Sequence, residues 1–150
     1  MRIARCIALA GLLLAACSEN LSVEQQIIAT LRIMEEAAEQ GEHFDFMDHV
    51  SDSFGGQQGS MDRRAFHRFM IFQINQNRRL QAQFFPIHVQ DTGDDRASAH
   101  FRLLVTGGAG FLPERGQFFE VETHWQLDGG DWMLIRADWE PVQLPEPRLD

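Results

Sequence analysis

The stretch QFFEVETHWQLDGGDWMLIRADW, residues 117–139, decides the fold of this chain. Its first half alternates, with Phe119, Val121, Thr123, Trp125 and Leu127 on one parity and mostly polar residues on the other. Because successive side chains of a strand point to opposite faces, this pattern predicts a strand with one dry face. A short turn, 128–131, carries two glycines, which tolerate the positive φ of a tight hairpin. The return strand is expected to turn four residues to the dry face: Met133, Ile135, Ala137 and Trp139.

Upstream of the hairpin, the period of the apolar residues first indicates helices. Ser22 to Gln40 carries an apolar stripe at three- and four-residue spacing, begins with a capping box and is followed by Gly41 as its stop. A second, shorter helix is expected over Phe44–Val50. A third is expected from Asp62, as N-cap, to about Asn75. The glycine-rich residues 54–60 lack the lysine of a phosphate-binding loop and are interpreted as a flexible connector.

From residue 78 the period changes to two, which predicts two more strands. Leu80, Ala82 and Phe84 share one face, and the dry set then becomes Phe85, Ile87 and Val89, so a bulge is expected beside Pro86. Residues 97–105 form the next strand. If residues 105–107 pair with 116–117, Arg102 lies near Glu120 and His100 near Glu122. Residues 107–115 are read as a loose connection, and the prolines after Glu140 predict an extended tail over 142–150.

This order of elements predicts an α+β domain of about three N-terminal helices packed on a curved antiparallel sheet of about four strands. The order, together with tryptophans before and just after the last turn (Trp125 and Trp132), resembles the NTF2-like (SnoaL-like, cystatin-like) superfamily over residues 22–141. The resemblance implies a cone whose open end often holds a pocket. It implies no single activity, because the superfamily contains isomerases, dehydratases, epoxide hydrolases, immunity proteins and plain binding modules.

The N-terminus is typical of an exported lipoprotein. Arg2 and Arg5 precede a short apolar run, and residues 14–17 read Leu-Ala-Ala-Cys. This arrangement resembles the bacterial lipobox, so we expect residues 1–16 to be a signal peptide, Cys17 to carry the lipid, and residues 17–21 to be a short tether. The expected location is the cell envelope, lipid-anchored, with Ser18 favouring the outer membrane and the domain facing the periplasm.

Charge and composition exclude several classes of partner. The net charge of −9, which becomes −11 without the two signal-peptide arginines, argues against nucleic acid. All 13 basic residues are arginine, so no lysine is available for a Schiff base or a phosphate loop, and no cofactor is expected. With Cys6 in the signal and Cys17 lipidated, no disulfide is expected in the mature domain.

Candidate site residues fall into two groups. Aromatic residues on the helices and the dry sheet face are the candidates for an apolar pocket: Phe46, Phe72, Phe101, Thr123, Trp125 and Trp139. Asp45, Asp48 and His49, with His43 nearby, are candidate acids and bases at the rim, although helix capping and a solvated surface explain them as well. A zinc site from His88, His100 and His124 is not favoured, because no local ligand spacing unites them.

Three functions remain open from the sequence. The first is a non-catalytic envelope lipoprotein that binds a small apolar ligand or another envelope protein. The second is a small isomerase or dehydratase that uses an acid near the second helix; the absence of tyrosine removes the oxyanion donor used by ketosteroid-isomerase-like members of the superfamily. The third is a structural or assembly module that dimerises through the outer sheet face, where charged and polar residues gather.

Overall fold

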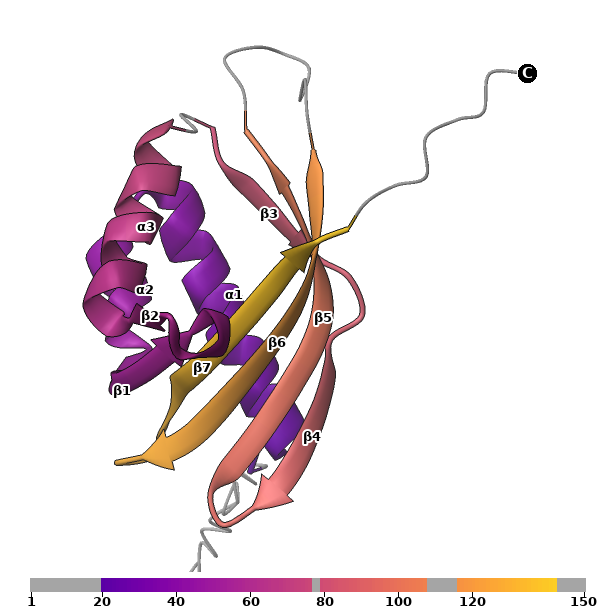
Figure 1. Cartoon of the computed structure of the whole chain (residues 1–150). Helices are drawn as coiled ribbons and strands as arrows, with labels where there is room; N and C mark the ends of the chain where they lie inside the picture. The colour runs from indigo at the N-terminus through magenta and orange to yellow at the C-terminus, as the bar shows by residue number, and fades with distance from the viewer. Residues whose placement is uncertain (1–19, 77–78, 108–115, 143–150) are drawn as a thin grey trace, which may run out of the picture.

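A computed structural model describes residues 20–76, 79–107 and 116–142 and confirms the α+β class. Three helices pack on one side of a strongly curved sheet (Figure 1). The signal peptide, Cys17, the 108–115 connection and the tail from 143 lie outside the described residues. The elements are α1 (Val23–Gln40), α2 (His43–Asp48), β1 (Val50–Gly56), a 3-10 turn η1 (Gln57–Gly59), β2 (Met61–Asp62), α3 (Arg63–Gln76), β3 (Gln81–Phe84), β4 (His88–Gly93), β5 (Arg96–Thr106), β6 (Gln117–Asp128) and β7 (Asp131–Pro141).

The sheet has more strands than expected and is mixed. Its order is β2-β1-β7-β6-β5-β3, with β4 also paired to β5, which makes seven strands instead of about four. β1 runs parallel to β7, whereas the other pairs are antiparallel. The interruption at 85–87, where a bulge was expected, separates β3 and β4, and both pair with the long β5. The expected register between β5 and β6 is confirmed, because Arg102 faces Glu120 and His100 faces Glu122.

The hairpin β6–β7 forms as expected, and the expected dry set of its second strand is correct for Ala137 and Trp139 but wrong for Met133 and Ile135. The pairing shifts between His124 and Trp125, whose partners are Arg136 and Leu134, so Ile135 is an extra residue in β7. An extra residue inverts the faces of the side chains on its two sides. Trp132 and Leu134 are therefore buried before the bulge and Ala137 after it, while Met133 and Ile135 are only partly buried.

α1, and the start of α3, lie where their capping residues predict. The Ser22–Gln25 capping box is formed in both directions, and Gly41 adopts φ 82° at the C-terminus of α1. The Asp62 carboxylate accepts the N–H of Ala65 at 2.7 Å at the start of α3. α2 is displaced from the expected Phe44–Val50, because Val50 is already the buried first residue of β1. No helix among the described residues is long and apolar enough to cross a membrane.

The glycine-rich segment, expected as a flexible connector, is held against the edge of the sheet. The Gln57 side-chain amide accepts the N–H of Trp139 and donates to its carbonyl, at 3.3 and 3.2 Å. The Gln58 N–H donates to the Asp138 carboxylate at 2.6 Å. Both glutamines have positive φ, 49° and 59°, a conformation that costs energy in a non-glycine residue. These bonds compensate for that cost and make η1 an ordered part of the edge.

Asp138 therefore gives a pH-dependent contribution to stability. Partial burial raises the pKa of its carboxyl, but the Gln58 N–H and Arg136 together outweigh burial and hold the pKa below its ordinary value. Because the folded pKa is the lower one, this contribution is complete above about pH 4 and is lost as the pH falls further. We expect Asp138→Asn to lower the free energy of unfolding by about 1 kcal/mol at pH 7 and by much less at pH 3. Urea unfolding at both pH values measures this, with the exposed Glu140→Gln as control; an equal cost at both would contradict it.

Candidate functional site

Three of the candidate pocket residues are buried in the core. Trp125 is 0% exposed and Phe101 3%. Thr123 is the buried polar residue of the described chain, and its hydroxyl accepts the Trp125 indole N–H at 2.9 Å and donates to the Ala99 carbonyl at 3.2 Å. The single donor of Thr123 and one of its two acceptor lone pairs are thus used within the core, where the residue is 3% exposed.

The other pocket candidates also contact aromatic neighbours or solvent. The Trp139 ring stacks on Phe69 with centroids 5.4 Å apart, and the Phe46 ring lies 6.0 Å from Phe66. Phe72, by contrast, is 55% exposed, so it lies on the solvent side of α3 and not with the pocket candidates. The inner rings therefore form a packed aromatic cluster of the kind that fills a core.

The candidate rim acids are not brought together inside the cone. Asp45 and Asp48 are exposed on α2, and His49 is its partly buried C-cap. The Asp45 side chain hydrogen-bonds Glu42, and this bond together with their charge repulsion raises the pKa of the Glu42 carboxyl. These positions are consistent with the solvated, helix-capping interpretation of the three residues.

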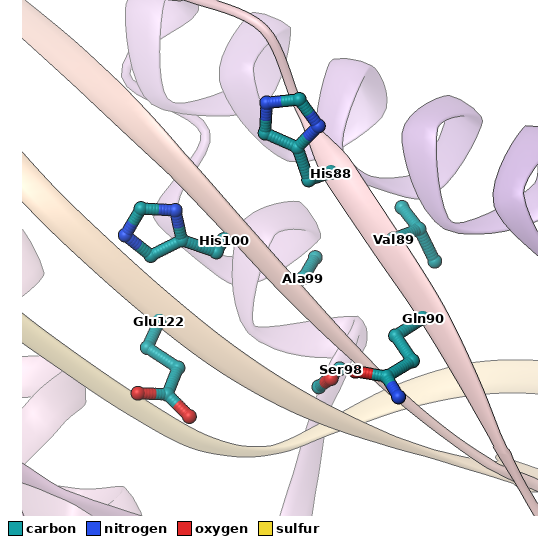
Figure 2. A pocket seen from close by; sticks show the side chains of 7 residues that line it. All are labelled: His88, Val89, Gln90, Ser98, Ala99, His100 and Glu122. Carbon is teal, nitrogen blue, oxygen red and sulfur yellow. The ribbon is translucent and has the colours of Figure 1, made fainter.

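The sheet face away from the helices carries two open hollows, which sequence reasoning did not locate. One, of about 340 Å³, is lined by seven residues of β4, β5 and β6: His88, Val89, Gln90, Ser98, Ala99, His100 and Glu122. Figure 2 shows His88, His100 and Glu122 on three successive strands of this hollow. The other, of about 460 Å³, includes Arg96, His124, Ile135 and Arg136. Within the described chain no three histidine, cysteine, aspartate or glutamate residues are grouped to hold a metal ion.

Ion pairs cover the middle of this outer face. Glu120 accepts from Arg102 at 2.5 Å and lies 3.3 Å from the His100 ring. Glu122 lies 3.1 Å from the His124 ring, and Arg136 lies 2.7 Å from Asp138. Such exposed pairs contribute roughly 0–1 kcal/mol each to stability. Their arrangement matters more for recognition, since complementary charges select partners and orient their approach.

The charges are unevenly distributed along the strands. In the half of the face near the start of β6, which we call the acidic half, Glu120, Glu122, Asp138 and Glu140 outnumber Arg102. The half near the β6–β7 turn carries Arg96, His124 and Arg136 together with Asp128 and Asp131. The indole of Trp132, beside that turn, donates to the Gln26 side chain in α1 at 3.0 Å. The N-terminal end of the domain therefore lies next to this second half.

An apolar strip lies beyond the acidic half, and we call Phe85, Leu104 and Phe118 the distal apolar row. Leu104 and Phe118 are directly opposite each other on β5 and β6. The rings of Phe85 and Phe118 are 5.7 Å apart, and Phe85 is 38% exposed, although it was expected on the dry face. The signal for this row was present in the sequence: Phe118 and Leu104 are apolar residues on the wet parity of their strands.

Comparison with solved structures identifies the fold. The chain is similar to an NTF2-like protein of unknown function from Pseudomonas putida KT2440 (TM-score 0.69, 15% identity, 85% of this chain and 93% of that one). It is also similar to a Streptomyces avermitilis protein provisionally named as a dehydratase of the NTF2-like family (TM-score 0.69, 17% identity, 80% and 96%). A third similar structure is Bd1075 of Bdellovibrio bacteriovorus (TM-score 0.68, 8% identity), of which this chain spans only 41%.

These similarities establish an NTF2-like, or cystatin-like, fold, as the sequence resemblance implied. At such low identity they extend to the fold alone. No protein-family model matches the sequence, and no curated protein is similar enough in sequence to be a relative.

Proposed function

We propose that this protein is a lipid-anchored envelope protein whose NTF2-like domain is a non-catalytic binding module. Its outer sheet face binds another protein of the envelope. The observation that carries the proposal is the contrast between the two faces of the sheet: Thr123 is hydrogen-bonded within an aromatic core, whereas the outer face offers uncovered ion pairs beside the distal apolar row. Apolar anchors rimmed by charged groups are the usual composition of a protein interface.

Catalysis is the less supported alternative. A general acid or base has to be within hydrogen-bonding reach of the proton that it transfers. The acidic candidates Asp45 and Asp48 are exposed on α2, and the buried sheet face presents only the Thr123 hydroxyl, which is already used. A small apolar ligand in the cone is less supported for the same reason, because the aromatic rings occupy the space that it would need.

The charge distribution favours a different protein as the partner over a second copy of this chain. Two copies can pack these faces together about a two-fold axis parallel to the strands, which keeps both tethers at one membrane. That arrangement brings the acidic half of one copy against the acidic half of the other, which costs free energy. An axis across the strands places the acidic half against the half that carries Arg96, His124 and Arg136, where Asp128 and Asp131 offset much of the positive charge.

The proposal is tested by photo-crosslinking in cells of the host. A photo-reactive phenylalanine analogue is placed in the lipidated full-length protein at Phe118, and a matched probe replaces Ile33, which is 52% exposed on α1. We expect a crosslinked band from position 118 only. The band should weaken at least fivefold when Glu120→Arg reverses the charge beside the row, because about 1.4 kcal/mol changes binding tenfold.

The identity of the band separates the alternatives. The proposal is supported if mass spectrometry finds a second protein in the band. We expect the surface of that protein to be complementary in charge to the acidic half. A band that contains only this chain, or crosslinking from position 33 and not from 118, overturns the outer face as the binding site for a different protein.

A further inference from the structure

Two histidines on different helices form a direct contact. His43 Nδ1 of α2 and His67 Nε2 of α3 are 2.9 Å apart, and their ring centroids are 5.0 Å apart. The Phe44 ring contacts both imidazoles, tilted against the His43 ring at 4.2 Å and edge-on to the His67 ring at 5.5 Å between centroids. Phe44 is 68% exposed, so burial does not fix the position of its ring. The contacts that hold the ring are those with the two imidazoles.

The contact requires a particular state of protonation. A neutral imidazole has one donor and one acceptor nitrogen, whereas a protonated imidazole has two donors. The 2.9 Å bond therefore forms when at least one of the two rings is neutral. When both rings carry a proton, two N–H groups and two positive charges face each other, and the bond is replaced by repulsion.

The charged surroundings favour loss of the contact in acid. Burial of the His67 ring lowers its pKa, and the charges of His43 and of Arg63 on α3 act in the same direction. Glu42 and Asp45 on α2 and Glu36 on α1 are the acidic groups on this side of the molecule, and their charges interact with one another. Glu42, Asp45 and Glu36 are exposed, so water screens their attraction for the two rings.

We propose that the His43–His67 contact is an acid-released latch between α2 and α3. Because His67 binds its proton less readily in the folded state, the latch is intact above about pH 6.5 and is lost as the pH falls below that value. This inference concerns the helical side of the domain and does not depend on the partner of the outer face.

Release frees only one end of α2. At the other end the Arg63 guanidinium donates to the Met47 and Val50 carbonyls at 3.0 and 3.1 Å, and the side chains of Met47 and Val50 are buried. The N-terminal half, which carries Phe44, can then pivot away from α3. This pivot separates Phe44 from the His67 ring, whereas Phe46, next to the anchored Met47, stays against Phe66.

Hydrogen exchange of the α2 amides tests the latch. Protection factors for residues 43–48, corrected for the pH dependence of intrinsic exchange, are compared in the full chain at pH 7 and pH 5. We expect them to fall by up to about tenfold per pH unit once the second proton binds. His67→Phe keeps an aromatic ring against Phe44 and removes the titration, so its α2 protection should not depend on pH. His100→Phe, on the outer face, should keep the wild-type acid response.

A second measurement keeps the test decisive if His67→Phe loosens α2 at every pH. The imidazole nitrogen shifts of His67, followed by NMR in the wild-type protein, should titrate below the ordinary histidine pKa. A titration of His67 at the ordinary histidine pKa, or protection of α2 that is the same at pH 7 and pH 5, would overturn the latch.

Discussion

Replacing Trp125 by alanine is expected to lower the free energy of unfolding by about 3–5 kcal/mol. The indole is 0% exposed, and its N–H donates to the Thr123 hydroxyl at 2.9 Å. The substitution leaves a cavity in the core beside β6 and removes the donor of that hydrogen bond. Because a domain of this size is stable by only about 5–15 kcal/mol, a large part of its stability depends on this one ring.

Chemical denaturation with tryptophan-independent detection, such as far-UV circular dichroism, measures the effect. Phe72→Ala is the matched control, because this substitution also removes an aromatic ring, but one from a residue that is 55% exposed. Trp139→Ala should give an intermediate cost, since that indole is only partly buried against Phe69. Unfolding of Trp125→Ala and Phe72→Ala at the same denaturant concentration would contradict the burial of Trp125 between the hairpin and the helices.

Replacing Cys17 by serine is expected to abolish membrane anchoring completely. In the lipoprotein that we propose, the Cys17 thiol is the attachment point of the lipid, and the acidic domain has no electrostatic attraction to an anionic bilayer that could hold it there instead. The variant should remain uncleaved by the lipoprotein peptidase and should not incorporate radioactive palmitate.

Cys6 provides the matched control, since it lies inside the expected signal peptide. Cys6→Ser should be processed and labelled like the wild type. Palmitate labelling that persists in Cys17→Ser, or that disappears in Cys6→Ser, would refute the assignment of the lipid to Cys17.

Local sequence determined the features that depend on neighbours along the chain. The capping residues Ser22 and Gly41 placed the ends of α1, because their hydrogen bonds are made within a few residues. The alternation in 117–127 predicted the buried face of β6, because the parity of a strand is a local property. It also led to the correct Arg102–Glu120 register, since strands joined through one connection can be aligned by their dry faces.

Residues far apart in the chain decided the rest. In β7 both parities are apolar, with Trp132 and Leu134 on one and Met133 and Ile135 on the other, so the pattern alone could not choose. The bulge at Ile135 makes the choice by burying Trp132 beside α1. Similarly, β1 becomes a strand through parallel pairing with β7, and its glycines gave no periodic signal.

The candidate site followed the same division. The sequence by itself determined which residues are aromatic, acidic or basic, and therefore which chemistry was available. Whether the rings of Phe101 and Trp125 would line a pocket or fill one depended on how closely the helices approach the sheet, and that distance is a property of packing. The contact between His43 and His67, 24 residues apart, likewise exists only because α2 and α3 pack together, so a side-chain interaction of this kind is decided by the tertiary structure.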